Sequence, residues 1–164
     1  AKTLFPYTTL FRSRRGAGRF HRPGGGRGLR AVALHARADE QHEVADFGHV
    51  EGDHILRQTA RIIKSSISAT DIAVRWGGEE MVIFRQSDSL PDAWAFADSI
   101  RRVIQDQVTV SRDPDWRVTA SVGVDLVPSN SLCVESVQRA DQAMYAAKAE
   151  GLCGRTKDFQ DRSY

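Results

Sequence analysis

Three features that define whole classes of proteins are scarce in this chain of 164 residues: cysteines, long apolar runs and, at one end, acidic residues. The two cysteines, Cys133 and Cys153, show neither the spacing of a metal site nor a disulfide framework, so we expect reduced thiols. No apolar run approaches the ~20 residues that a membrane span needs, and no secretory signal is visible. These absences predict a cytoplasmic protein with no membrane segment in this chain.

Acidic residues are absent from residues 1–38, which hold nine basic residues, whereas the rest of the chain holds 14 basic and 21 acidic residues. A basic arm of this kind can bind nucleic acid. Residues 3–13, however, match codon for codon the translation of a sequencing-adapter oligonucleotide, and the Arg- and Gly-rich residues 14–30 are typical of disorder. We therefore interpret residues 1–45 as a non-native or disordered segment and residues 46–164 as the domain, and we expect no nucleic-acid partner.

The remaining chain has the periodicity of a globular α/β domain. Apolar residues recur with helical spacing in residues 53–68, 90–107 and 134–150. They alternate in residues 117–126, as in a strand that buries one face, and residues 29–34 are a candidate short strand. This order predicts an α/β sandwich with a central sheet flanked by helices.

The segment with the strongest functional signal is residues 71–85, D-I-A-V-R-W-G-G-E-E-M-V-I-F-R. Two apolar runs flank Gly77 and Gly78, which predicts a β-hairpin, because glycine adopts the positive φ that a tight turn demands. Glu79 and Glu80 follow the glycines, and carboxylates are hard oxygen ligands suited to Mg²⁺ beside substrate phosphates. The alternative is an ordinary hairpin with solvated glutamates.

The wider pattern resembles one family. The sequence from Arg75 to Met81, R-W-G-G-E-E-M, resembles the signature of the GGDEF domain, the diguanylate cyclase family. Residues 47–56, 118–124 and 140–151 resemble three further motifs of that family in the same order, so that the resemblance spans residues 47–155. It implies a mixed five-stranded sheet flanked by helices, related to the palm of nucleotide cyclases and polymerases. It also implies condensation of two GTP molecules into cyclic di-GMP and pyrophosphate.

Catalytic and substrate-binding roles follow from the resemblance for the turn residues. Glu79 stands at the position of a metal ligand for Mg²⁺ or Mn²⁺, and Glu80 is a second catalytic residue that assists a second metal or the attacking hydroxyl. Gly77 and Gly78 are substrate-binding positions, because without side chains they let the phosphates of GTP approach the backbone.

Two positions outside the hairpin are also expected to bind substrate. Asp53 matches an Asp that accepts hydrogen bonds from the guanine edge, although a helix N-cap is an alternative. Lys148 matches a lysine that neutralises the terminal phosphates, and its alternative is a solvated helix lysine.

One departure from the family pattern bears directly on activity. In a gapless alignment the first metal-binding Asp of the family falls on Ala36, and with one deleted residue it falls on Arg37. A Mg²⁺ site that lacks one of its few carboxylates should bind metal-nucleotide weakly. Two hypotheses stay open: a diguanylate cyclase that is impaired in this chain, or a degenerate GGDEF domain that holds GTP or a partner protein without turnover.

The resemblance also bears on assembly and regulation. One GGDEF domain holds one GTP, so catalysis is expected to need a homodimer, and a sensory domain is expected upstream in a complete protein. The product-binding R-x-x-D motif of the family corresponds to S-A-T-D here, with Ser68 in place of the Arg and Asp71 retained. We therefore expect no tight site for cyclic di-GMP, and strand direction gives no reason to aim Arg75 or Arg85 at Asp71.

Overall fold

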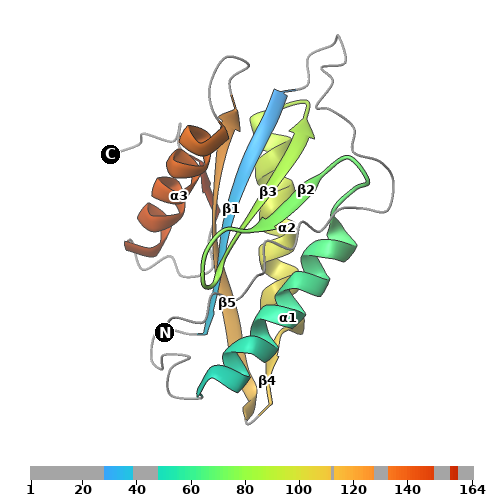
Figure 1. The fold of residues 1–164 in the computed structure, drawn as a ribbon, viewed down its shortest axis with the longest axis vertical. Coiled ribbons are helices and arrows are strands. Elements are labelled where there is room, and N and C mark those ends of the chain that lie inside the picture. Colours follow the sequence, from blue (N-terminus) through green and yellow to red (C-terminus); the bar gives the residue numbers. More distant parts are fainter. Residues whose placement is uncertain (1–27, 39–47, 112, 128–132, 150–155, 159–164) are drawn as a thin grey trace, which may run out of the picture.

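The computed structural model describes residues 28–38, 48–111, 113–127, 133–149 and 156–158. These residues form three helices and six strands (Figure 1). The helices of residues 53–68, 90–107 and 134–150, the hairpin between the first two and the strand of residues 117–126 are all present in the expected order. In sequence the elements are β1 (Gly28–Ala38), α1 (Gly48–Ser66), β2 (Ile72–Arg75), β3 (Glu80–Ser87), α2 (Leu90–Gln107), β4 (Thr109–Val110), β5 (Asp113–Val127), α3 (Cys133–Ala149) and β6 (Thr156–Asp158).

The strands form one mixed sheet in the order β2-β3-β1-β5-β4, with β6 beside β5. All pairs are antiparallel except β5 with β6, which is parallel. The sheet therefore has six described strands, one more than the resemblance implied. Figure 1 shows β1 running through the middle of the sheet, between β3 and β5.

Strand β1 is longer than the candidate strand of residues 29–34, and it precedes the boundary that we expect after residue 45. The pairing of β1 in the sheet does not test whether residues 1–45 are native. The domain boundary after residue 45 therefore stays a prediction. The adapter-like residues 3–13 and Cys153 lie outside the described residues. Among the described helices, none is long and apolar enough to cross a membrane.

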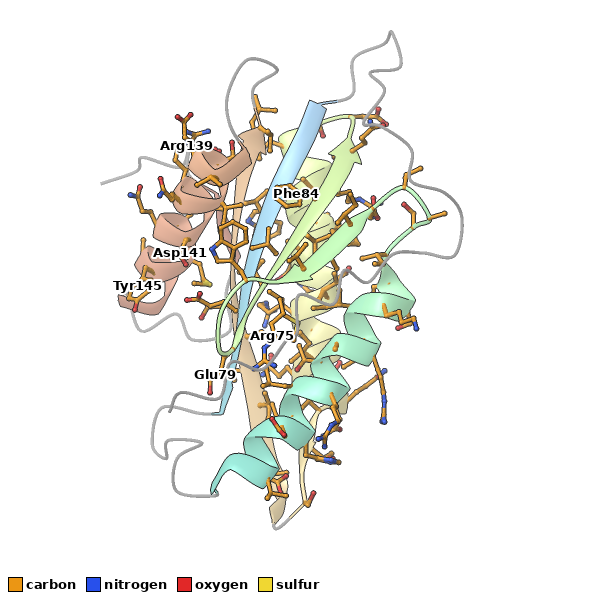
Figure 2. The ribbon with its side chains drawn as sticks, in the orientation of Figure 1. Arg75, Glu79, Phe84, Arg139, Asp141 and Tyr145 are labelled. Carbon is orange, nitrogen blue, oxygen red and sulfur yellow. The ribbon has the colours of Figure 1, made fainter. Side chains whose placement is uncertain are left out.

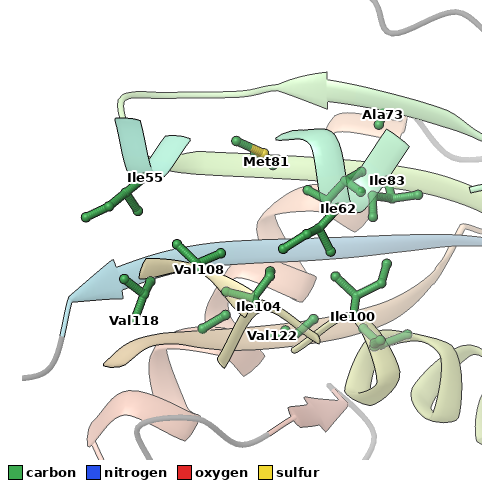
Figure 3. Close-up of a cluster of buried hydrophobic side chains, with 14 of the residues drawn as sticks. Ile55, Ile62, Ala73, Met81, Ile83, Ile100, Ile104, Val108, Val118 and Val122 are labelled. Carbon is green, nitrogen blue, oxygen red and sulfur yellow. The ribbon is translucent and has the colours of Figure 1, made fainter. Parts of the chain in front are cut away.

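Helices cover both faces of the sheet, and β3 shows this by alternation. Met81 and Ile83 belong to the larger core cluster with residues of α1 and α2, whereas Val82 packs with Val137 of α3. The expected inward face of β5 is confirmed, because its alternating apolar residues are at most 1% exposed. Figure 3 shows these side chains meeting those of α1 and α2. The buried members of the larger cluster are Ile55, Ile62, Ile63, Ala73, Met81, Ile83, Ala93, Ala97, Ile100, Ile104, Val108, Val110, Val118, Ala120, Val122 and Val124.

On the opposite face, α3 lies close to β5 at Gly123. A Cβ built on Gly123 would collide with the backbone carbonyl of Ala140 and lie 2.6 Å from the backbone N of Met144. Because both obstacles are helix backbone, no rotation of a side chain can relieve the collision. Glycine at this position therefore sets the distance between α3 and the sheet.

Helix α2 begins as its sequence predicts. Ser89 is the N-cap, with an extended backbone, and its Oγ accepts a hydrogen bond from the backbone N of Asp92 at 3.2 Å. Pro91 stands in the first turn, where a missing N–H costs nothing. The helix thereby follows β3 after only two residues, and its buried side chains join the larger core cluster with those of β5.

Candidate functional site

The predicted hairpin is confirmed, and its turn is longer than a tight two-residue turn. Strands β2 and β3 pair from Ile72 opposite Phe84 to Arg75 opposite Met81, which leaves residues 76–79 as the turn before β3 begins. The backbone N–H of Trp76 donates to the carbonyl of Glu80 at 2.8 Å and closes the turn. Figure 2 shows this turn as the free end of the hairpin, beside β1, with β1 and β5 extending beyond it.

The reason that we expected for the two glycines is wrong. Neither Gly77 nor Gly78 has a φ between +20° and +160°, so neither supplies a left-handed conformation. Four-residue hairpin loops are commonly built around an ordinary type I turn, which needs no positive φ at its central residues. The glycines must therefore be explained by space.

The space around the two glycines differs. A Cβ on Gly77 would lie 2.7 Å from Oε2 of Glu80, so the carboxylate of Glu80 rests against Gly77. A Cβ on Gly78 would have no heavy atom of the described residues within 4 Å, apart from its own chain neighbours. Gly77 therefore makes room for a side chain of the turn itself, whereas Gly78 borders open space.

Arg75, the last residue of β2, bonds to the backbone of the turn. Its Nε lies 3.2 Å from the carbonyl oxygen of Gly77 and 3.0 Å from that of Gly78, and its Nη2 lies 2.6 Å from the latter. Sequence reasoning included Arg75 in the signature but gave it no role. The sequence did contain a signal for this role. The guanidinium group of Arg75 carries several N–H donors and stands next to a turn whose backbone carbonyls can accept them.

The two glutamates of the turn are half-buried, and Figure 2 shows Glu79 at the tip of the hairpin. The ladder between β1 and β3 ends with His35 opposite Glu80, so Ala36 and Glu79 each stand one residue beyond the last pair. Whether the missing family Asp corresponds to Ala36 or to Arg37 stays a prediction of the alignment. Both residues belong to β1, just beyond the pair of His35 with Glu80.

The donor set fits Mg²⁺ or Mn²⁺ only as a partial site. Mg²⁺ in nucleotide enzymes is held by one or two carboxylates together with substrate phosphates and water. Glu79 and Glu80 supply oxygen ligands of this kind. Within the described ranges, no three His, Cys, Asp or Glu residues gather as they would in a metal site made by protein alone.

Asp53 and Lys148 belong to helices on opposite sides of the sheet. Asp53 lies inside α1, which begins at Gly48, so the alternative of a helix N-cap is wrong. Its side chain is 55% exposed and its Oδ2 lies 3.4 Å from Arg57 on the next turn. Lys148 lies in the last turn of α3, and its side chain is outside the described part of the chain.

At the open end of the hairpin, one expectation is wrong. Nη1 of Arg85 lies 2.8 Å from Oδ2 of Asp71, although we saw no reason for either hairpin arginine to point there. Asp71 and Arg85 each stand one residue beyond Ile72 and Phe84, the last pair of the β2–β3 ladder at this end, and their side chains meet there. The same carboxylate oxygen accepts a hydrogen bond from the backbone N of Ser68 at 2.8 Å. Asp71 is thus already neutralised inside the protein.

Solved structures with the same fold are GGDEF domains. The GGDEF domain of DgcB from Caulobacter crescentus, in complex with c-di-GMP, superposes with a TM-score of 0.69 at 21% identity, covering 82% of this chain and 80% of that one. The GGDEF domain of YfiN from Pseudomonas aeruginosa superposes with a TM-score of 0.67 at 27% identity, covering 80% and 82%. The α/β fold expected for a GGDEF domain is therefore confirmed.

The family follows from sequence comparison. A family model described as "Diguanylate cyclase, GGDEF domain" matches residues 38–152, and the chain belongs to this family. Diguanylate cyclase A of Treponema denticola is 36% identical over 110 residues, which are 64% of this chain and 29% of that protein. The response regulator PleD of Caulobacter vibrioides is 37% identical over 108 residues, again 64% of this chain and 24% of that protein. The chain thus spans less than a third of these relatives.

Proposed function

We propose that this GGDEF domain condenses two GTP molecules into cyclic di-GMP and pyrophosphate, and that the reaction is impaired in this chain. The observation that carries the proposal is the turn at Gly78, which borders open space beside two carboxylates and has no conformational need for glycine. A ligand that lies against the backbone explains such a residue. Named relatives include diguanylate cyclases, which supports GTP as that ligand.

Each role falls to a group on the chain. The 3′-hydroxyl of one GTP attacks the α-phosphate of the other, and pyrophosphate leaves. Gly77 and Gly78 let the phosphates approach the turn, Asp53 accepts hydrogen bonds from the guanine edge, and Lys148 neutralises the terminal phosphates. Asp53 suits this role because its carboxylate is more than half exposed.

The acidic residues of the turn complete the site. Glu79 would hold Mg²⁺ or Mn²⁺, which when bound supplies neutralisation of phosphate charge. Glu80 assists a second metal or the attacking hydroxyl. Ala36 stands one residue beyond the last pair of the β1–β3 ladder, where the resemblance implies a metal-binding Asp, and alanine supplies no carboxylate. This observation favours a second candidate function for the chain as it stands, a domain that binds GTP or a partner protein without turnover.

We propose a homodimer as the active form, in the cytoplasm, because one domain holds one GTP and two half-sites must face each other across a two-fold axis. If turnover is detectable, its specific value should rise with protein concentration. A rate that is independent of concentration in a demonstrated monomer would contradict the dimer.

The experiment that tests the function restores the missing carboxylate. Purified chain is incubated with Mg²⁺ and GTP, and cyclic di-GMP and pyrophosphate are followed by chromatography. The unchanged chain should show little or no product, and Ala36→Asp should raise turnover by at least about tenfold, which corresponds to about 1.4 kcal/mol of transition-state stabilisation.

The control adds Glu79→Ala to Ala36→Asp, which should remove the gain because the metal position again lacks a carboxylate. Turnover by the unchanged chain at the level of an intact relative would show that a carboxylate at position 36 is unnecessary. If none of these chains binds GTP, the proposed function is wrong.

A further inference from the structure

The hydrogen bonds of Arg75 fix the direction of two successive peptide groups. In an extended strand, successive carbonyls point to opposite sides. Here the carbonyl oxygens of Gly77 and Gly78 both lie within 3.2 Å of one guanidinium group. The two peptide planes are therefore turned so that their oxygens converge on Arg75.

This convergence determines where the N–H groups point. In a trans peptide the carbonyl and the following N–H point in opposite directions. The carbonyl of Gly77 shares its peptide plane with the N–H of Gly78, and the carbonyl of Gly78 shares its plane with the N–H of Glu79. Both N–H groups therefore point away from the guanidinium, toward the other side of the turn.

Successive N–H groups that point to the same side form an anion-binding concavity. Gly78 lies at this place with open space around it, so an anion can reach the backbone without displacing a side chain. Figure 2 shows Arg75 beside the turn and Glu79 at its tip.

We propose that Arg75 is a positioning residue that turns the N–H groups of Gly78 and Glu79 toward a phosphate group of the nucleotide. It acts by holding the carbonyls of Gly77 and Gly78 on its own side, which also keeps their partial negative charges away from the phosphate. The inference rests on the proposed function, because it concerns the same turn. The inference adds Arg75 to the proposed site, and it names backbone N–H groups as the donors that contact the phosphate.

The competing explanation is that Arg75 attracts phosphate directly as a cation. Replacement of Arg75 by lysine distinguishes the two explanations. Arg75→Lys keeps the charge, but a single ammonium on a flexible stem lacks the planar fork that contacts both carbonyls. If Arg75 acts through the turn, Lys should be nearly as harmful as Met; if it acts as a cation, Lys should preserve binding.

The experiment uses inorganic pyrophosphate as the anion and the backbone amide spectrum of the isotope-labelled chain as the readout. In the unchanged chain, pyrophosphate should shift the amide signals of Gly78 and Glu79. Arg75→Met and Arg75→Lys should each weaken this binding by about tenfold or more, because the preorganised donors are lost. Arg61→Met, at an exposed position on α1, removes the same charge and should leave the affinity within about twofold of the unchanged chain.

A second readout tests the positioning without any ligand. The carbonyl carbon signals of Gly77 and Gly78 should move in both Arg75 variants, because hydrogen bonds to those oxygens are lost, while the signals of β2 and β3 stay in place. This readout remains available for Arg75→Lys if Arg75→Met does not fold.

Three results would overturn the inference: wild-type affinity for pyrophosphate in Arg75→Lys, carbonyl signals that do not move, or no shift at Gly78 and Glu79 in the unchanged chain. GTP is titrated in parallel. If GTP binds and pyrophosphate leaves both amides unmoved, the inference fails while the proposed function stands; if GTP does not bind, the proposed function fails.

Discussion

The two ends of the β2–β3 hairpin each carry an arginine, and the two arginines are used differently. At the open end, Arg85 pairs with Asp71, whose side chain is 2% exposed, and the guanidinium lies over the ring of Phe96 at 4.0 Å from its centre. At the closed end, Arg75 bonds to the backbone carbonyls of a turn that borders open space.

The difference separates stability from function. The charge of Asp71 is matched inside the protein and its carboxylate is covered, so this carboxylate is not available to a ligand. At the closed end the arginine shapes a piece of backbone beside two glutamates. The closed end should therefore matter mainly for nucleotide binding, and the open end mainly for folding.

The largest expected effect is on stability, at the open end. Arg85→Met leaves the buried Asp71 carboxylate without its cation, and we expect the free energy of unfolding to fall by about 3 kcal/mol, the scale found when one partner of a buried pair is removed. Arg75→Met removes only hydrogen bonds at an exposed turn, and we expect a loss of less than about 1.5 kcal/mol.

Urea unfolding of the two variants beside the unchanged chain measures both values. Equal losses of unfolding free energy in the two variants, or a larger loss in Arg75→Met, would contradict the assignment of stability to the open end of the hairpin.

A smaller effect is expected on binding of cyclic di-GMP at the open end. The unchanged chain should show no tight site in calorimetric titration, because Ser68 offers no charge and Asp71 is already paired with Arg85. Ser68→Arg should strengthen binding by one to two orders of magnitude, since a charge-assisted contact contributes roughly 1.5–3 kcal/mol. Sub-micromolar binding by the unchanged chain, lost in Asp71→Ala, would show that the pair is open to the ligand.

The local parts of the fold followed from sequence. Helix α2 has both an apolar face and an N-terminal signal in Ser89 and Pro91, so its start was predictable, and the expected end at Gln107 is confirmed. Strands β4 and β6 have two and three residues, too few for any periodicity to appear. The full length of β1 depends on its pairing with β3 and β5, which lie far away in sequence, and no local pattern reports such pairing.

The site was predictable in residue types but less so in geometry. Gly77 and Gly78 were assigned to the turn correctly, but the positive φ expected for them presumed a two-residue turn. The two-residue turn that we expected would set Asp71 opposite Phe84, so the pair of Asp71 and Arg85 follows only from the observed register. For Arg75 the sequence offered a fork of donors beside the turn, but the direction of its hydrogen bonds depends on how the turn residues orient their carbonyls.

The measurement that tests the central claim most directly is GTP binding by Gly78→Ala, the variant with the smallest expected effect on folding. A methyl group here has no atom of the described residues within 4 Å, apart from its chain neighbours, and no unfavourable φ, so the free energy of unfolding should stay within about 1 kcal/mol of the unchanged chain. The methyl would occupy the space into which we place a phosphate. The account therefore predicts that calorimetric titration with GTP and Mg²⁺ shows binding at least about tenfold weaker than in the unchanged chain. Equal GTP affinity in the two chains would contradict it, because the open space at Gly78 would then have no part in holding the nucleotide.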